Sequence, residues 1–161
     1  SMKRKGLKDR IIEGQHIEKA GNNTRYSNYC IYRNMRKRVS NILSHKHSYF
    51  ITFTIKDDSL GLQRDTYRRK IKEALGTASE WVANEDYGKI NGRLHFHAFV
   101  GYDYDLDYTT ITDIYKFGAV NFRKTYDIND EAISKYLLKL TLHALKETAN
   151  FIFYSRKKRT T

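Results

Sequence analysis

The order of its secondary-structure signals predicts that this chain folds as an α+β domain with a central antiparallel sheet. Runs rich in β-branched and aromatic residues alternate with helical segments in the order strand, helix, hairpin, helix, strand, helix. The hairpin near the middle of the chain has Asn91-Gly92 as its expected turn, and a tight turn makes its two strands antiparallel. This order favours a ferredoxin-like sheet of about five strands, with the helices packed mainly on one face.

The length and composition indicate one globular domain with a polyanionic partner. A chain of 161 residues can bury a sizeable core, and 40% hydrophobic residues exclude a disordered chain. The net charge of +12 suits nucleic acid or a membrane surface. No apolar run approaches the length of a membrane span, so we expect nucleic acid as the partner and the cytoplasm as the location. With Cys30 as its single cysteine, the chain cannot form an internal disulfide.

Each remaining element has a local signal. Asp65 or Thr66 is the expected N-cap of the helix TYRRKIKEAL, which Gly76 closes, and Asn129 or Asp130 is the expected N-cap of the last long helix. The expected elements are a helix at 24–43, a strand at 48–55, this helix at 66–75, hairpin strands at 81–87 and 93–100, a weak helix at 109–116, a strand at 119–126, the last helix from about 131 and a short strand or docked tail at 151–154.

The chain is expected to be a single domain, 1–161, with basic residues that contact nucleic acid at several places. A basic arm (about 1–23) precedes the first helix, and a basic tail (about 155–161) ends the chain. Part of this charge is also expected to be an ordinary solvated helix face. The residues expected to contact nucleic acid are Arg33, Arg36, Lys37, Arg38, Arg93, Arg156, Lys157, Lys158 and Arg159.

Two histidines in the second hairpin strand are candidate metal ligands. In LHFHAFV, a period of two places His95 and His97 on one face and the apolar Leu94, Phe96 and Ala98 on the other. Neighbouring imidazoles with a carboxylate suit a divalent cation. Spacing alone is weak evidence, because His45-Lys46-His47 has the same spacing at the start of a strand.

The third ligand is expected to be Asp86 rather than the adjacent Glu85. Only one of two neighbouring strand residues can share a face with the histidines. A two-residue turn at Asn91-Gly92 predicts that Asp86 lies opposite His97 and that Gly88 lies opposite His95, which would leave room above the histidine. An odd slip of register would select Glu85 instead.

The last long helix supplies a candidate nucleophile and a cation. Tyr136, Lys139 and His143 fall on one stripe, next to an apolar stripe formed by other residues of the helix. A tyrosine at the edge of the core would give the same pattern. Together with a metal, however, a tyrosine can attack a phosphodiester while a lysine steadies the developing charge.

Three segments in this order resemble motifs of the HUH endonucleases, specifically the single-tyrosine initiators of rolling-circle replication from plasmids, phages and circular single-stranded DNA viruses. They are YFITFTI, LHFHAFV and YLLK, and EDYG also resembles an acid-Tyr-Gly stretch of the phage-type members. The resemblance implies nicking of single-stranded or hairpin origin DNA with Mn²⁺ or Mg²⁺, a 5′-phosphate linked to Tyr136, a free 3′-OH, and rejoining of ends. It also implies a helicase, either from the host or on a longer chain.

Two other functions remain open. A single-tyrosine transposase is similar in fold and length, but that family has Gln four residues after the tyrosine, where this chain has Leu140. A non-catalytic binder of single-stranded nucleic acid would explain the charge and the strand aromatics without requiring His95, His97 and Tyr136 together.

Overall fold

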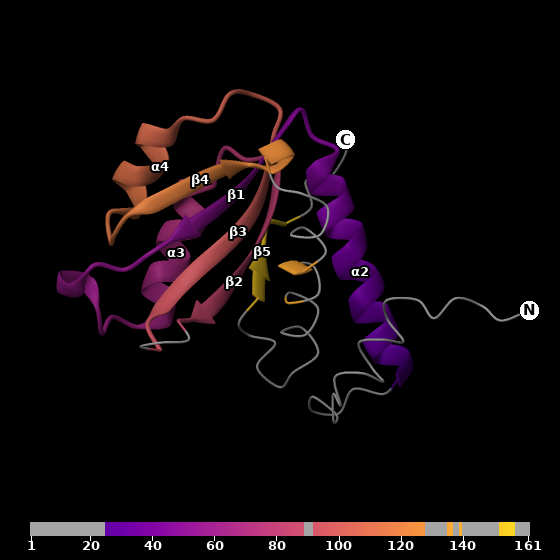
Figure 1. Cartoon of the computed structure of the whole chain (residues 1–161), viewed down its shortest axis with the longest axis horizontal. Coiled ribbons are helices and arrows are strands. Elements are labelled where there is room, and N and C mark those ends of the chain that lie inside the picture. Colours follow the sequence, from indigo (N-terminus) through magenta and orange to yellow (C-terminus); the bar gives the residue numbers. More distant parts are fainter. Residues whose placement is uncertain (1–24, 89–91, 128–134, 137–138, 140–151, 157–161) are drawn as a thin grey trace, which may run out of the picture.

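The computed structural model describes residues 25–88, 92–127, 135–136, 139 and 152–156 of the chain. Within these ranges, helices and strands are mixed along the sequence, which confirms the α+β class (Figure 1). The elements are the helices α2 (Arg25–Leu43), α3 (Arg64–Ala74) and α4 (Tyr108–Tyr115), the strands β1 (His47–Phe53), β2 (Glu80–Tyr87), β3 (Leu94–Tyr102), β4 (Val120–Lys124) and β5 (Ile152–Tyr154), and the short 3-10 turns Asp57–Ser59 and Thr125–Asp127.

The five strands form one antiparallel sheet in the order β4-β1-β3-β2-β5. The hairpin strands β2 and β3 pair along their whole length, and β1 lies on the other side of β3. The expected short strand near the C-terminus is confirmed, because β5 pairs with β2 and forms one edge of the sheet. The antiparallel sheet of about five strands predicted from the sequence is therefore present.

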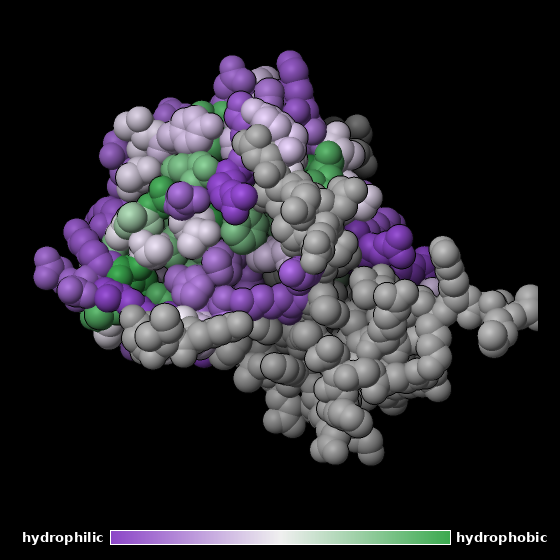
Figure 2. Space-filling model, in the orientation of Figure 1, coloured by the Kyte–Doolittle hydropathy of each residue, from purple (hydrophilic) through white to green (hydrophobic). Residues whose placement is uncertain are grey.

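One face of the sheet carries the larger part of the core. The inward residues of β1 and β3 alternate as predicted, with Ile51, Phe53, Phe96 and Ala98 all fully buried on this face. Helices α3 and α4 cover it, as Figure 1 shows, and contribute Tyr67, Ile71, Ala74, Ile111 and Tyr115. On the surface that Figure 2 shows, hydrophobic side chains form several small areas between hydrophilic ones.

The opposite face has a smaller apolar cluster and also carries the polar residues discussed below. Helix α2 lies along this face (Figure 1) and packs Val39 and Ile42 against Val82 and Phe99 of the sheet. Tyr136, from the segment expected to form the last long helix, joins the same cluster. The described helices therefore lie on both faces, two on one and α2 on the other; most of the last predicted helix lies outside the described residues.

Two helix starts differ from the predicted ones. Helix α3 begins at Arg64 with Gln63 as its N-cap and no side-chain cap, so the expected cap by Asp65 or Thr66 is wrong. Asp65 instead lies in the first turn, where a negative charge favours the helix dipole. Helix α4 is capped by Asp107, whose carboxylate accepts a hydrogen bond from the backbone N–H of Thr110 at 3.1 Å.

The hairpin register differs from the prediction by two residues. Asp86 pairs with His95, and Asn84 pairs with His97, so the expected opposition of Asp86 to His97 and of Gly88 to His95 is wrong. The connection is longer than two residues: the N–H of Gly92 donates to the carbonyl of Gly88, and Gly92 itself adopts a left-handed φ of 62°. A shift of two preserves the face of every side chain, because strand residues alternate with a period of two.

Candidate metal and tyrosine site

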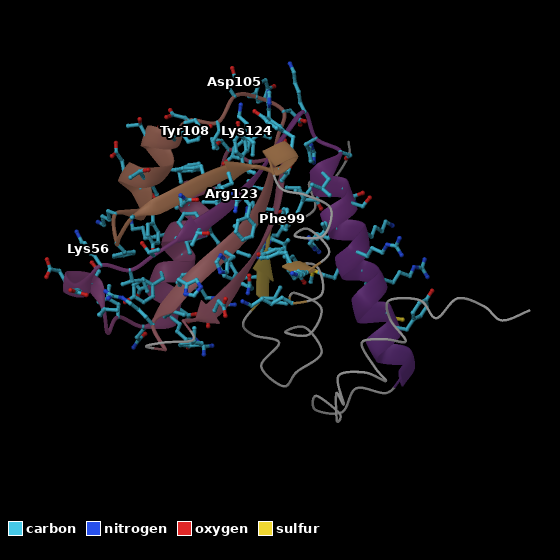
Figure 3. The ribbon with its side chains drawn as sticks, viewed as in Figure 1. Lys56, Phe99, Asp105, Tyr108, Arg123 and Lys124 are labelled. Atoms are coloured by element: carbon cyan, nitrogen blue, oxygen red, sulfur yellow. The ribbon has the colours of Figure 1, made fainter. Side chains whose placement is uncertain are left out.

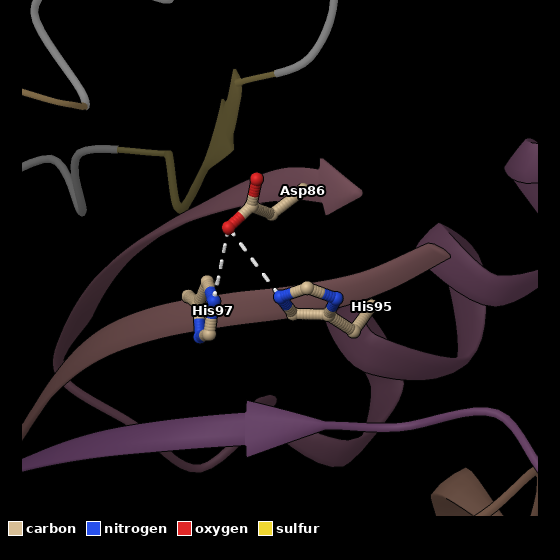
Figure 4. A group of neighbouring side chains, drawn as sticks. All are labelled: Asp86, His95 and His97. Atoms are coloured by element: carbon tan, nitrogen blue, oxygen red, sulfur yellow. Dashed lines mark ion pairs between the residues drawn. The ribbon is translucent and has the colours of Figure 1, made fainter. Parts of the chain in front are cut away.

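Asp86, His95 and His97 converge on the sheet face that α2 partly covers (Figure 4). The Nε2 atoms of both histidines lie 3.4 Å from Oδ2 of Asp86. Two donor atoms bound to one ion at about 2.1 Å are about 3.0–3.4 Å apart for ordinary bond angles. The three donor atoms all lie within 4.8 Å of one another, so the group could hold a metal ion, and Asp86 rather than Glu85 lies on this face, as predicted.

The other ring nitrogen of each histidine has a partner that fixes its orientation. His95 Nδ1 is 3.3 Å from the backbone carbonyl of Arg93, which can only accept a hydrogen bond, so Nδ1 is the donor and Nε2 faces Asp86. His97 Nδ1 is 3.2 Å from the hydroxyl of Thr52, its cross-strand neighbour on β1. Partners of this kind hold a metal-ligating imidazole in its tautomer and plane.

The electrostatics of the site favour the forms that bind a cation. Burial lowers the pKa of His97 to about 4, with a further contribution from His95, so its imidazole is neutral at physiological pH. Burial raises the pKa of Asp86, but its hydrogen bond and charge interaction with Lys139 and the nearby histidines outweigh this effect. The net result is a lowered pKa, and Asp86 is ionised.

Lys139 contacts the same carboxylate oxygen that both histidines approach. Its Nζ donates to Oδ2 of Asp86 in a charge-assisted hydrogen bond, and the lysine side chain is 42% exposed. The predicted cation is thus placed next to the three candidate ligands. Its positive charge also balances the negative charge of Asp86. The ammonium group and a bound metal ion would therefore share the same carboxylate oxygen.

Tyr136 is buried beside this group and is held by a side chain on β2. Its hydroxyl donates to Oδ1 of Asn84 at 2.9 Å, and Asn84 lies directly opposite His97. The Asn84 amide nitrogen donates to the backbone carbonyl of Glu85, which orients Oδ1 toward the tyrosine. Burial raises the pKa of Tyr136, and the negative charge of Asp86 raises it further, so the resting hydroxyl is protonated.

Aromatic packing fixes the tyrosine ring and one ligand together. The Tyr136 ring makes edge contacts with Phe50 at 4.8 Å and with Phe99 at 4.5 Å between centroids. Phe50 also stacks on the imidazole of His97, with the ring planes 24° apart. Rings held on several sides lose little additional freedom when a ligand binds.

Glu85 points away from the site, as predicted. It is fully buried on the face covered by α3, with Arg64 and Arg68 at 3.3 and 3.4 Å from its carboxylate oxygens. Burial raises the pKa of Glu85, and the two arginine charges only partly offset this effect. Its position indicates a structural role in joining α3 to β2.

The residues predicted to contact nucleic acid lie at several separate places. Arg33, Arg36 and Lys37 are exposed on α2. Arg38 is half-buried, donates weakly to the carbonyl of Ser155 and lies 3.9 Å from the Tyr154 ring centroid, so it also fastens β5. Arg93 donates to the carbonyl of Ile55 at 2.8 Å and to Asp57 at 2.5 Å.

Several of the predicted functional residues lie outside the described part of the chain. The described chain reaches Arg156, whereas the basic arm, Lys157, Lys158, Arg159 and His143 lie outside the described residues. Contact of all these groups with nucleic acid remains a prediction.

The second His-x-His pair, His45 and His47, does not resemble the candidate metal site in its contacts. His45 contacts Asp103 through Nδ1 at 3.0 Å and Glu80 through Nε2 at 3.7 Å, so its two ring nitrogens face different acids. His47 is paired with the exposed Asp105 at 3.4 Å. These contacts diverge rather than meet at one point, and the described residues form no three-ligand group there.

Sequence reasoning missed four residues of the site: Asn84, Phe50, Arg123 and, as a partner of His97, Thr52. The alternation of each strand contains the signal for them. Asn84 is two residues before Asp86, and Thr52 and Phe50 alternate against the apolar residues of β1. Their assembly depends on the pairing of β1 with β3 and β4, which local patterns do not specify.

Comparisons with known proteins give the chain no family. No protein-family model matches it, and no curated protein matches it significantly. Among solved structures it is similar to the hypothetical protein ORF119 from Sulfolobus islandicus rod-shaped virus 1, with 20% sequence identity and a TM-score of 0.48 over 71% of this chain and 96% of that one. No described helix is long and apolar enough to cross a membrane.

Proposed function

We propose that this protein is a metal-dependent endonuclease and strand transferase acting on single-stranded DNA, of the kind that starts rolling-circle replication. The observation that carries the proposal is the placement of Tyr136 beside Asp86, His95 and His97, with Asn84 joining the tyrosine to the strand that bears Asp86. A purely structural tyrosine would not require two imidazoles and an ionised carboxylate to converge next to it. The motif resemblance described above supports the same reaction.

The reaction would be a transesterification at one phosphodiester. The oxygen of Tyr136 attacks the phosphorus as its proton passes to solvent water, the bond from phosphorus to the 3′ oxygen breaks, and that oxygen takes up a proton from water to become a free 3′-OH. The DNA then remains joined to Tyr136 through a 5′-phosphate. Reversal by a 3′-OH rejoins the ends and releases the tyrosine.

The side chains around the phosphate have separable roles. Asp86, His95 and His97 would hold Mn²⁺ or Mg²⁺, which polarises the phosphate when bound. Two imidazoles favour Mn²⁺, whereas phosphate chemistry commonly uses Mg²⁺. Asn84 accepts the hydrogen bond of the resting tyrosine but cannot remove its proton, so it positions the nucleophile. Lys139 would stabilise the charge that develops on the phosphate oxygens.

The decisive experiment is a covalent adduct assay with single-stranded DNA. A pool of random-sequence oligonucleotides labelled at the 3′ end is incubated with the protein and Mn²⁺, then separated in SDS. The label should migrate with the protein, because the fragment that carries the 5′-phosphate retains the 3′ end. DNA binding without any adduct over the whole pool would instead identify a non-catalytic binder.

Replacing Lys139 with Met should have opposite effects on metal binding and on the reaction. Its ammonium group occupies the same Asp86 oxygen that a metal ion needs, so its loss should tighten Mn²⁺ binding about tenfold, as measured by calorimetry. Adduct formation should nevertheless become slower, because the positive charge on the phosphate is lost. Lys135→Met, one turn earlier, is the charge-matched control and should change Mn²⁺ affinity much less; equal tightening in both variants would contradict a direct role for Lys139.

A further inference from the structure

Next to the tyrosine, the described residues line an open cleft of about 320 Å³, and Asp86 is not among its lining residues. Its walls contain the aromatic rings of Phe50, Phe99 and Tyr136 and the side chain of His97. Its cations are Arg123, Lys135 and Lys139, and no acidic side chain of the described part of the chain lines it. Such walls suit a ligand with a planar apolar part and negative charge.

Arg123 lies at the far side of this cleft from the metal ligands. The registers place Phe99 of β3 opposite Phe50 of β1, and Phe50 opposite Arg123 of β4. Figure 3 labels Phe99 and Arg123 on these strands. Two strand spacings separate Arg123 from β3, about 10 Å between backbones. Asp86 is one strand further away, on β2. Arg123 is therefore too far away to contact the phosphate that is cleaved at the metal site. It is placed to bind a neighbouring phosphate of the same strand.

Phe50 lies between these two positions and is well held. It stacks on His97, and it meets Phe99 edge-on at 5.5 Å and Tyr136 edge-on at 4.8 Å. The ring is nevertheless only half-buried, so part of it faces the cleft. Stacking of a base on a fixed aromatic ring is worth about 1–3 kcal/mol and tolerates any sequence.

We infer that this cleft binds one unpaired nucleotide adjacent to the cleaved phosphate, with its base against Phe50 and its phosphate on Arg123 and Lys135. The cleft volume is at the lower end of the range for ligand pockets, about 300–1,000 Å³, which suits a single nucleotide and not a stacked base pair. The inference rests on the proposed function for its ligand, single-stranded DNA. It adds a residue, Arg123, that positions the strand through its phosphate.

Adjacent cations on β4 provide a matched test. Strand alternation places Arg123 on the cleft face, whereas Lys124 points to the other face and lies 5.5 Å from the ring centroid of Tyr126. Binding of fluorescein-labelled oligothymidylate is measured by anisotropy at several salt concentrations, for the full chain and for Arg123→Gln and Lys124→Gln. Arg123→Gln should weaken binding about tenfold and reduce the salt dependence by about 0.7 log units per log unit of salt, the value of one single-strand phosphate contact. Lys124→Gln should change both much less.

The outcomes separate this inference from the proposed function. Equal effects of the two substitutions, no effect of Arg123→Gln, or duplex DNA bound as tightly as the single strand would overturn the cleft assignment. A selective loss in Arg123→Gln supports it even if the intact chain forms no covalent adduct, in which case the endonuclease proposal alone fails. An adduct with unchanged binding by Arg123→Gln would mean that the reaction occurs without this subsite.

Discussion

Tyr136→Phe should form no covalent adduct with single-stranded DNA, a loss of at least about 1,000-fold in rate, while still binding the DNA. The substitution removes only the hydroxyl. The phenylalanine ring can keep the edge contacts with Phe50 and Phe99, so the aromatic cluster is retained. Asn84 loses the hydroxyl that it accepts from, which should cost about 1–2 kcal/mol of unfolding free energy. The adduct assay in SDS and an anisotropy titration measure the two effects separately.

A neighbouring tyrosine serves as the control for this substitution. Tyr87 follows Asp86 on β2, is 44% exposed and points to the other face of the hairpin. Tyr87→Phe should react at the rate of the unchanged chain. An adduct that persists in Tyr136→Phe and maps by mass spectrometry to another tyrosine would remove Tyr136 from the proposed mechanism.

The parts of the site that could be predicted from sequence are those determined by strand alternation. A period of two places His95, His97 and Asp86 on one face whatever the exact pairing, provided that the slip is even. The predicted register assumed a two-residue turn, but the hydrogen bond from Gly92 to Gly88 closes a longer loop. The predicted face of Asp86 was therefore right, although its predicted cross-strand partner was wrong.

The parts that could not be predicted depend on contacts between distant segments. The Asn84–Tyr136 hydrogen bond joins residues 52 positions apart, and the cleft needs β4 to pair with the far side of β1. The predicted N-cap of α3 was wrong for a more local reason. Asp65 favours the first turn of the helix through its charge, without being the cap. Residue preferences constrain such a position but do not choose between neighbouring residues.

Substitution of the two adjacent acids of β2 should have opposite outcomes for metal binding and for stability. Asp86→Ala removes one of three candidate ligands, and Mn²⁺ affinity by calorimetry should fall at least about 100-fold, with loss of adduct formation. Removing the partner of Lys139 costs little stability, since that side chain is 42% exposed. The folded state should therefore survive, and thermal unfolding without metal verifies this.

Glu85→Ala should instead retain metal affinity and destabilise the fold. Glu85 is fully buried, and its loss leaves Arg68, whose side chain is only 17% exposed, without the carboxylate that it faces. Breaking a buried ion pair costs about 3–5 kcal/mol, and the partial exposure of both arginines reduces this to about 2 kcal/mol. Glu85→Gln keeps the shape and provides a milder variant if the alanine variant does not fold. If either Glu85 variant lost Mn²⁺ binding while folded and Asp86→Ala retained it, the hairpin would have the opposite face toward the histidines, and the metal centre described here would be wrong.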